Sequence, residues 1–118
     1  MNVLIVDDSR AMRMIVARTL RQMSVQVRSI TEAGDGTEAL PLVAANRYDL
    51  IICDWNMPQM NGMELLRELR KSGVDTRFGF CTSEATPEMR VQGMQAGAQF
   101  FVTKPFTAES FQFAMKAA

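Results

Sequence analysis

Short apolar runs alternate along the chain with longer stretches in which apolar residues recur every three or four positions. The short runs are rich in β-branched and aromatic residues, as buried strands are, and the longer stretches have the period of amphipathic helices. The pattern predicts strands at residues 3–6, 27–33, 49–53, 77–81 and 99–102. It predicts helices at residues 9–23, 37–45, 61–71, 86–96 and 107–117. We therefore expect five consecutive strand–helix units.

The strand-like runs VLIV, LIIC and FFV leave no polar position that could face water. Strands that are buried on both sides and separated by helices are typical of a parallel sheet with helices on both faces. The pattern therefore predicts an α/β fold. Two residues conflict with it: Pro41 should weaken or kink the predicted second helix, and Gly79 adds no packing to the predicted fourth strand.

The composition is that of a single ordinary globular domain. The 118 residues are 47% hydrophobic and 22% charged, enough for one core and too few for two domains. Acidic and basic residues balance at 13 each, which argues against attraction of the whole surface to nucleic acid or anionic lipid. No apolar run has the length of a membrane span, and the N-terminus does not resemble a signal peptide, so we expect a cytoplasmic protein.

Residues that are absent or isolated exclude several kinds of chemistry. The chain contains no histidine, which removes serine–histidine catalysis and a typical zinc site. Cys53 and Cys81 each lie inside an apolar strand-like run, with no second cysteine or histidine nearby. We expect both to pack in the core rather than form a disulfide or bind a metal.

Polar residues follow within one or two positions of the ends of four of the apolar runs. They are Asp7, Asp8, Asp54, Thr82 and Lys104. In an open parallel sheet, ligands bind beyond the carboxyl ends of the strands, where the strand order reverses. Each residue has an ordinary alternative role, as a helix cap for the aspartates and the threonine or as a solvated cation for the lysine. Their combined placement nevertheless predicts that they share one edge of the sheet.

Three neighbouring carboxylates repel one another unless a cation lies among them or their pKa values rise. Oxygen-only ligands select a hard ion, which predicts Mg²⁺, and Lys104 supplies a further positive charge. A carboxylate beside Mg²⁺ and a lysine can accept a phosphoryl group as an acyl phosphate. Asp54 is our candidate because it stands apart from the other two acids and precedes a loop, WNMPQMNG, that can shape a pocket. Pro105 follows the lysine, and the sequence leaves the isomer of their peptide bond open.

Five segments of the chain have the order and spacing of a known family: LIVDDSRAMR, AGDGTEAL, DLIICDWNMPQMNGMELL, CTSEAT and AGAQFFVTKPFT. Together they resemble a response-regulator receiver domain over nearly the whole chain, most closely the stand-alone chemotaxis members of that family. The resemblance implies one receiver domain over residues 1–118, with a flavodoxin-like, doubly wound (βα)5 fold and the strand order 2-1-3-4-5.

The resemblance also implies a role for each residue at the acidic edge. It makes Asp54 the phosphoacceptor, with Lys104 and Thr82 holding the phosphoryl oxygens. It implies that Mg²⁺ is bound by Asp8, Asp54 and the Asn56 backbone carbonyl, and by Asp7 mainly through water.

A conformational switch is a further implication of the resemblance. Phe101 stands where the best-known chemotaxis members have a tyrosine, which turns inward when the switch threonine is drawn to the phosphoryl group. Asn56 and Glu84 match the pair that influences phosphoryl lifetime and is found in fast-cycling chemotaxis regulators. We expect output through binding of another protein at the face made by the fourth helix, the fifth strand and the fifth helix, with Phe101, Thr103 and Phe106.

The sequence thus predicts a monomeric phosphoacceptor switch rather than a turnover enzyme. It would be phosphorylated by a sensor histidine kinase and would lose the group by hydrolysis. Because no effector domain follows the last helix, we expect the flagellar motor switch protein as output partner, with a phosphatase as a further partner. Two alternatives within the family stay open: a stand-alone shuttle in another phosphorelay, and the truncated receiver of a DNA-binding regulator.

Two rivals from other classes share parts of this pattern. A Mg²⁺-dependent phosphohydrolase forms its own aspartyl phosphate, but it places nucleophile and acid two residues apart, whereas Asp7 and Asp8 are adjacent. A flavin-binding module has the same architecture, but it needs a phosphate loop rich in Ser, Thr and Gly where this chain has DDSRAMR.

Overall fold

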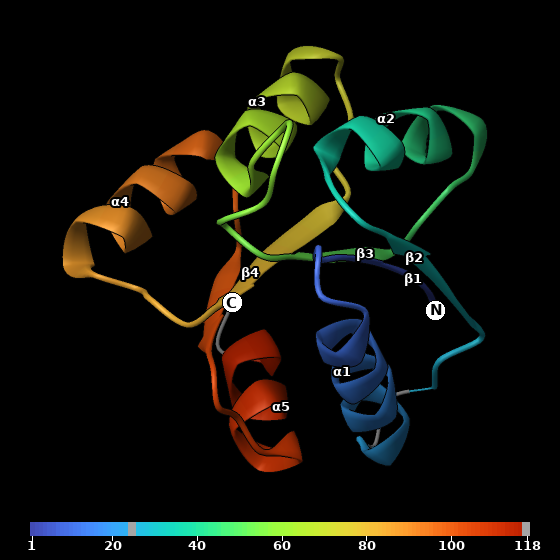
Figure 1. Ribbon diagram of the computed structural model, residues 1–118, viewed down its shortest axis with the longest axis vertical. Helices are drawn as coiled ribbons and strands as arrows, with labels where there is room; N and C mark the ends of the chain where they lie inside the picture. Colours follow the sequence, from blue (N-terminus) through green and yellow to red (C-terminus); the bar gives the residue numbers. More distant parts are fainter. Residues whose placement is uncertain (24–25, 117–118) are drawn as a thin grey trace.

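A computed structural model describes residues 1–23 and 26–116 and shows five strands alternating with five helices (Figure 1). The strands are β1 (Asn2–Val6), β2 (Ser29–Ala33), β3 (Leu50–Cys53), β4 (Arg77–Thr82) and β5 (Phe100–Thr103). The helices are α1 (Arg10–Gln22), α2 (Gly36–Ala45), α3 (Gly62–Lys71), α4 (Pro87–Ala96) and α5 (Ala108–Lys116). Every predicted element is present, and the last residue of the predicted final helix, 117, lies outside the described residues.

All five strands are parallel and lie in the order β2-β1-β3-β4-β5, which confirms the doubly wound, flavodoxin-like arrangement. Helices α1 and α5 cover one face of the sheet, and α2, α3 and α4 cover the other (Figure 1). The strand order reverses between β1 and β3, where Val6 pairs with Cys53. The residues that follow these two strands therefore leave the sheet side by side.

Each face of the sheet has its own hydrophobic core. The core under α2, α3 and α4 includes Leu4, Val6, Ile51, Cys53, Phe78, Phe80 and Phe101. The core under α1 and α5 includes Val3, Ile5, Leu50, Ile52, Cys81, Phe100 and Phe111. Both cysteines are buried and free, as predicted, and they lie on opposite faces of the sheet.

The two residues that conflict with the sequence pattern are accommodated in different ways. Helix α2 continues through the exposed Pro41 without a break. Gly79 pairs with Phe100 on β5, and a Cβ atom at Gly79 would lie only 2.1 Å from two atoms of that ring. The glycine therefore makes room for an aromatic side chain of the neighbouring strand.

No helix of the described residues is long and apolar enough to cross a membrane.

Candidate functional site

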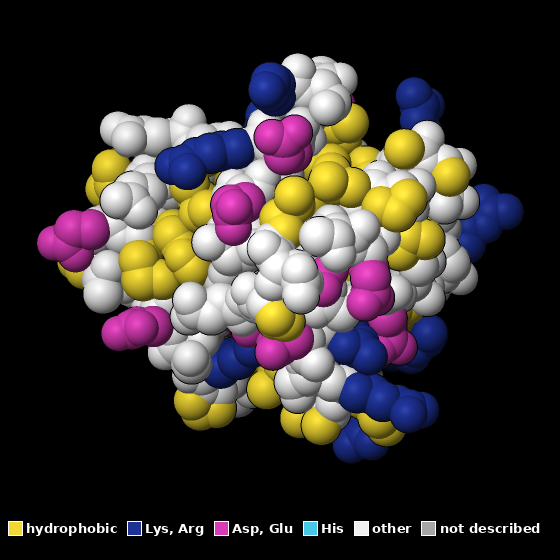
Figure 2. All heavy atoms as spheres, turned by 45° about the horizontal axis from the view of Figure 1, so that its top comes forward, with side chains coloured by type: hydrophobic (Ala, Val, Ile, Leu, Met, Phe, Trp, Pro, Cys, Tyr) yellow, Lys and Arg dark blue, Asp and Glu magenta, His cyan; other side chains and the backbone are white. Residues whose placement is uncertain are grey.

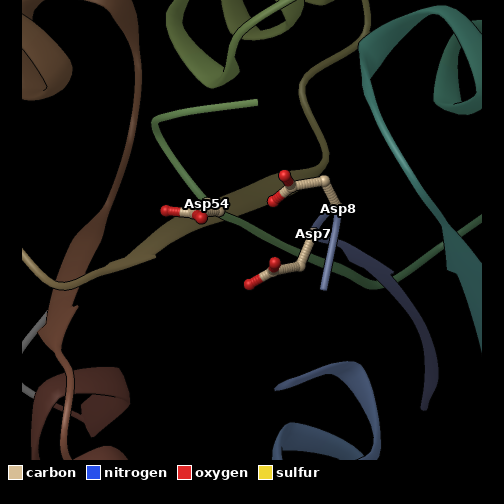
Figure 3. Close-up of side chains that lie close together, drawn as sticks. All are labelled: Asp7, Asp8 and Asp54. Atoms are coloured by element: carbon tan, nitrogen blue, oxygen red, sulfur yellow. The ribbon is translucent and has the colours of Figure 1, made fainter. Parts of the chain in front are cut away.

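Three carboxylates meet at the point where the strand order reverses. Asp7 follows β1 and Asp54 follows β3, and their amides donate hydrogen bonds to the Ala33 and Val6 carbonyls at 3.1 and 2.9 Å, which extends the sheet by one residue. One oxygen from each of Asp7, Asp8 and Asp54 lies within 4.8 Å of the other two (Figure 3). The rigid strand ends thus bring together the three acids that the sequence singled out.

The ammonium of Lys104 lies among these carboxylates. Its Nζ is 2.9 Å from Oδ2 of Asp7 and 3.4 Å from Oδ2 of Asp54, and only 15% of its side chain is exposed. Its backbone amide donates to the Thr82 carbonyl at 2.9 Å, which fixes the end of β5 against the end of β4. The peptide bond between Lys104 and Pro105 is cis.

Burial and charge shift the pKa values of this ion pair. Burial raises the pKa of Asp54, and the neighbouring Asp7 raises it further, while Lys104 and the Trp55 amide act in the opposite direction. Burial alone would lower the pKa of Lys104, but its hydrogen bond to Asp7 and the nearby carboxylate charges outweigh that effect and raise the pKa. The lysine is therefore held in its charged form, and the charge of Asp54 is incompletely compensated by the protein.

Thr82 ends β4 and has a buried hydroxyl group without a partner. The residue is 0% exposed, and its Oγ1 makes no hydrogen bond to any described residue. An unsatisfied buried hydroxyl costs about 1–3 kcal/mol, so such a group in a native protein calls for an explanation.

Asn56 and Glu84, in the loops that follow β3 and β4, are both exposed.

The loop between β3 and α3 is held tightly against Asp54. The Trp55 amide donates to Oδ1 of Asp54 at 2.8 Å, and the Gly62 amide donates to the Trp55 carbonyl at 2.9 Å. A Cβ atom at Gly62 would lie 2.3 Å from the Asp54 carbonyl oxygen, so only glycine fits there. Asn61 caps α3 in a reciprocal capping box with Glu64. The Asn-Gly pair before a helix indicates a turn, but the sequence does not reveal this close backbone approach.

The three residues predicted at the partner face differ in burial and in the core that they pack against. Phe101 is only 8% exposed and packs with Phe80 in the core beneath α4, with ring centres 5.0 Å apart. Phe106 belongs to the core on the opposite face of the sheet, 5.2 Å from the ring of Phe111. Thr103 is exposed at the end of β5.

A groove of about 400 Å³ runs along α4, β5 and α5, lined by Arg90, Met94, Gln99, Phe100, Phe101, Phe113 and Ala114. The Arg90 guanidinium carbon lies 5.5 Å from the centre of the Phe101 ring, within range of a cation–π contact. On the face drawn in Figure 2, acidic and basic side chains are interspersed, with hydrophobic groups gathered between them. That face has no single dominant charge, in keeping with the balanced composition.

The fold agrees with comparisons to known proteins. The family model described as "Response regulator receiver domain" matches residues 3–116. The chain belongs to this family, whose members are the receiver domains of two-component response regulators.

Among curated relatives, the chain is 40% identical over 114 residues to "Chemotaxis protein CheY" of Pseudomonas aeruginosa, covering 92% of this chain and 88% of that protein. It is 39% identical over 115 residues to "Response regulator MprA" of a Mycobacterium species, covering 98% of this chain and 49% of the relative. The chain therefore spans nearly the whole of the first relative and about half of the second.

Two solved structures have the same fold. The receiver domain of the Francisella response regulator 1452 superposes with a TM-score of 0.85 at 29% identity, covering 98% of this chain and 93% of that chain. The Vibrio cholerae chemotaxis response regulator CheY4 superposes with a TM-score of 0.83 at 35% identity, covering 98% and 96% of the two chains.

Proposed function

We propose that Asp54 accepts a phosphoryl group from the phosphohistidine of a sensor histidine kinase, in a reaction that requires Mg²⁺. The observation that supports this most directly is the placement of the Lys104 ammonium 3.4 Å from one Asp54 oxygen, within the cluster of three carboxylates. This arrangement leaves Asp54 as a half-buried carboxylate nucleophile whose surroundings are prepared for additional negative charge.

The acidic cluster fits a divalent cation. All its donors are oxygens, and the burial-raised pKa of Asp54 indicates that the protein alone does not neutralise the carboxylates. We assign Asp8, Asp54 and the Asn56 backbone carbonyl as direct ligands of Mg²⁺, with Asp7 acting mainly through water. When bound, the ion offsets negative charge on the phosphoryl oxygens.

In the transfer itself, an Asp54 carboxylate oxygen forms the new bond to phosphorus as the bond from phosphorus to the histidine nitrogen breaks. Lys104 donates a hydrogen bond to a phosphoryl oxygen, and the Thr82 hydroxyl donates to another. The lack of a protein partner for Thr82 Oγ1 supports this role, because a phosphoryl oxygen would satisfy it.

Water later hydrolyses the acyl phosphate, and Asn56 and Glu84 keep its lifetime short. The protein thus acts as a switch and not as a turnover enzyme.

The phosphorylated state is proposed to change the face formed by α4, β5 and α5. Phe101 already lies inward in this structure, and unlike a tyrosine it has no hydroxyl group that would favour a position at the surface. We therefore propose that Thr82, drawn toward the phosphoryl group, moves the loop between β4 and α4 while the Phe101 ring stays in the core. That movement would reshape the groove beside Arg90 and the surface near Thr103 and Phe106.

The flagellar motor switch protein is the proposed output partner of a monomeric, cytoplasmic protein, and a phosphatase is a further proposed partner. Similarity to a chemotaxis protein over nearly its whole length supports this choice. The second candidate is a receiver within a longer regulator, because the MprA relatives are about twice as long as the matched region. Phosphorylation-dependent binding to purified motor switch protein, compared with binding of a full-length regulator to DNA, distinguishes the two.

Titration with beryllofluoride, a phosphoryl analogue, tests the proposed chemistry. Trp55 contacts Asp54 through its amide, so its fluorescence should respond when the analogue occupies the site. We expect a response in the wild type with Mg²⁺, and none without Mg²⁺ or in Asp54→Asn. An unchanged response in the variant would refute the assignment.

A further inference from the structure

The Asp7–Asp8 turn contains one carboxylate that is fixed and one that is free. Asp7 is buried, with its Oδ1 accepting from the Ser9 amide at 2.9 Å and its Oδ2 accepting from Lys104. Asp8 is exposed, and its carboxylate makes no hydrogen bond or ion pair with any described residue. The direction of Asp8 is therefore set by the backbone that carries it rather than by partners of its own.

Arg13 holds that backbone. Its Nη1 donates a 2.6 Å hydrogen bond to the carbonyl oxygen of Asp7, which belongs to the peptide group joining Asp7 to Asp8. Its Nε donates to Oε1 of Glu32 on β2 at 2.8 Å, and the arginine side chain is only 17% exposed. These two hydrogen bonds fix the guanidinium group between the Asp7 carbonyl and the Glu32 side chain.

The geometry points to Arg13 as a positioning residue for the divalent-cation site, acting through the Asp7–Asp8 peptide group and itself oriented by Glu32. This inference rests on the proposed Mg²⁺ requirement and goes beyond the residues assigned to it above. Arg13 contacts no carboxylate of the cluster, so its effect on the metal is indirect. Groups that orient metal ligands in this way typically contribute 10–100-fold to metal affinity.

The sign of the effect separates positioning from simple electrostatics. A guanidinium group near three carboxylates repels a divalent cation, so removing it should tighten Mg²⁺ binding if charge alone matters. Removing a positioning contact should weaken binding instead, because Asp8 then loses its preferred direction. The two explanations therefore predict opposite results for Arg13→Gln.

Mg²⁺ titrations of the purified protein, followed by Trp55 fluorescence and by calorimetry, test this inference. We expect Arg13→Gln to weaken Mg²⁺ binding by about tenfold. Glu32→Ala, which keeps the arginine charge but removes the acceptor of its Nε, should also weaken binding, by a smaller factor. The matched control is Arg18→Gln, which removes the same charge from an exposed position of α1 and should leave Mg²⁺ affinity unchanged.

Thermal unfolding without Mg²⁺ establishes that each variant is folded. Unchanged or tighter Mg²⁺ binding by folded Arg13→Gln would overturn the inference. If that variant does not fold, Glu32→Ala decides, and unchanged affinity in it would be equally decisive against the role of Arg13. Failure of the wild type to bind Mg²⁺ would instead refute the metal requirement of the proposed function.

Discussion

The acidic cluster and the groove along α4, β5 and α5 are two regions built on different physical grounds. Charged groups just beyond the strand ends form the cluster, and backbone hydrogen bonds to neighbouring strands hold Asp7, Asp54 and Lys104 in place. Close contact of apolar side chains makes the groove, where a Cβ atom at Gly93 would lie 2.5 Å from the Phe101 ring. Electrostatic balance therefore governs the first region, and steric fit governs the second.

Removal of the lysine should disturb the cluster most. Lys104→Met leaves Asp7 and Asp54 without their counter-ion, and we expect the free energy of unfolding to fall by about 2–3 kcal/mol near neutral pH. The loss should be smaller than the ~3–5 kcal/mol of a fully buried pair, because some solvent reaches the lysine. Chemical denaturation of both proteins, with and without Mg²⁺, measures the loss and its expected partial recovery by the ion.

The pH dependence gives a second view of the same substitution. Folding raises the pKa of Lys104. The stability that the charged lysine gives the folded protein is therefore complete below its unfolded pKa of about 10.4, and it is lost as the pH rises through the higher folded pKa. The wild type should thus lose its advantage over Lys104→Met in strongly alkaline solution. The advantage should also shrink in acid, because the pKa of Asp54 is raised and its carboxylate becomes neutral as the pH falls. A pH-independent difference would show that the lysine stabilises through packing alone.

Steric crowding should destabilise the groove by a smaller amount. Gly93→Ala gains helix propensity of up to ~1 kcal/mol but forces Phe101 out of its place, at a cost of about 1–3 kcal/mol. We expect a net loss of about 1 kcal/mol, and we expect Phe101→Leu in the same protein to remove most of the crowding. A double-mutant cycle measures this coupling. A stabilised Gly93→Ala protein would mean that α4 does not confine the ring.

Neutralising the proposed phosphoacceptor should stabilise the protein slightly. The pKa of Asp54 is raised on folding, chiefly by burial, so its ionised form opposes folding at neutral pH. Without Mg²⁺, Asp54→Asn should raise Tm by roughly a few degrees. The difference should shrink as the pH falls through the folded pKa of Asp54, because the wild type then gains stability by protonation. Thermal unfolding at several pH values provides the measurement, and a lower Tm for the variant near pH 7 would contradict the sign.

The exposed end of the groove should contribute almost nothing to stability. Phe113 is 75% exposed on α5, so we expect Phe113→Ala to change the free energy of unfolding by less than about 0.5 kcal/mol. Phe111→Ala is the matched control on the same helix, because Phe111 is fully buried and its truncation should cost about 3–5 kcal/mol. Comparable losses in the two variants would mean that Phe113 packs as a core residue.

These contrasts explain which features the sequence could predict. Alternating apolar runs determine the strands, and a parallel sheet then places the residues after each strand at one edge, so Asp7, Asp54 and Lys104 could be located without coordinates. The fits at Gly79 and Gly93 depend on the distance between a missing Cβ atom and a ring on another element. No periodic pattern carries that information.

The partner face shows the same distinction. The sequence predicts that Phe101 and Phe106 contribute to one face, and the structure packs them against the cores on opposite sides of the sheet. The role of Arg13 likewise leaves no sign in the sequence pattern. Its two hydrogen-bond partners, the Asp7 carbonyl and Glu32, lie on other elements that only the folded chain brings to it.

Intact-protein mass spectrometry after incubation with acetyl phosphate tests the central claim most directly. We expect the wild type to gain the mass of one phosphoryl group when Mg²⁺ is present, and peptide mapping to place that group on Asp54. Without Mg²⁺, or in Asp54→Asn, no such gain should occur. A phosphoryl group found on another residue, or equal labelling of Asp54→Asn, would contradict the account.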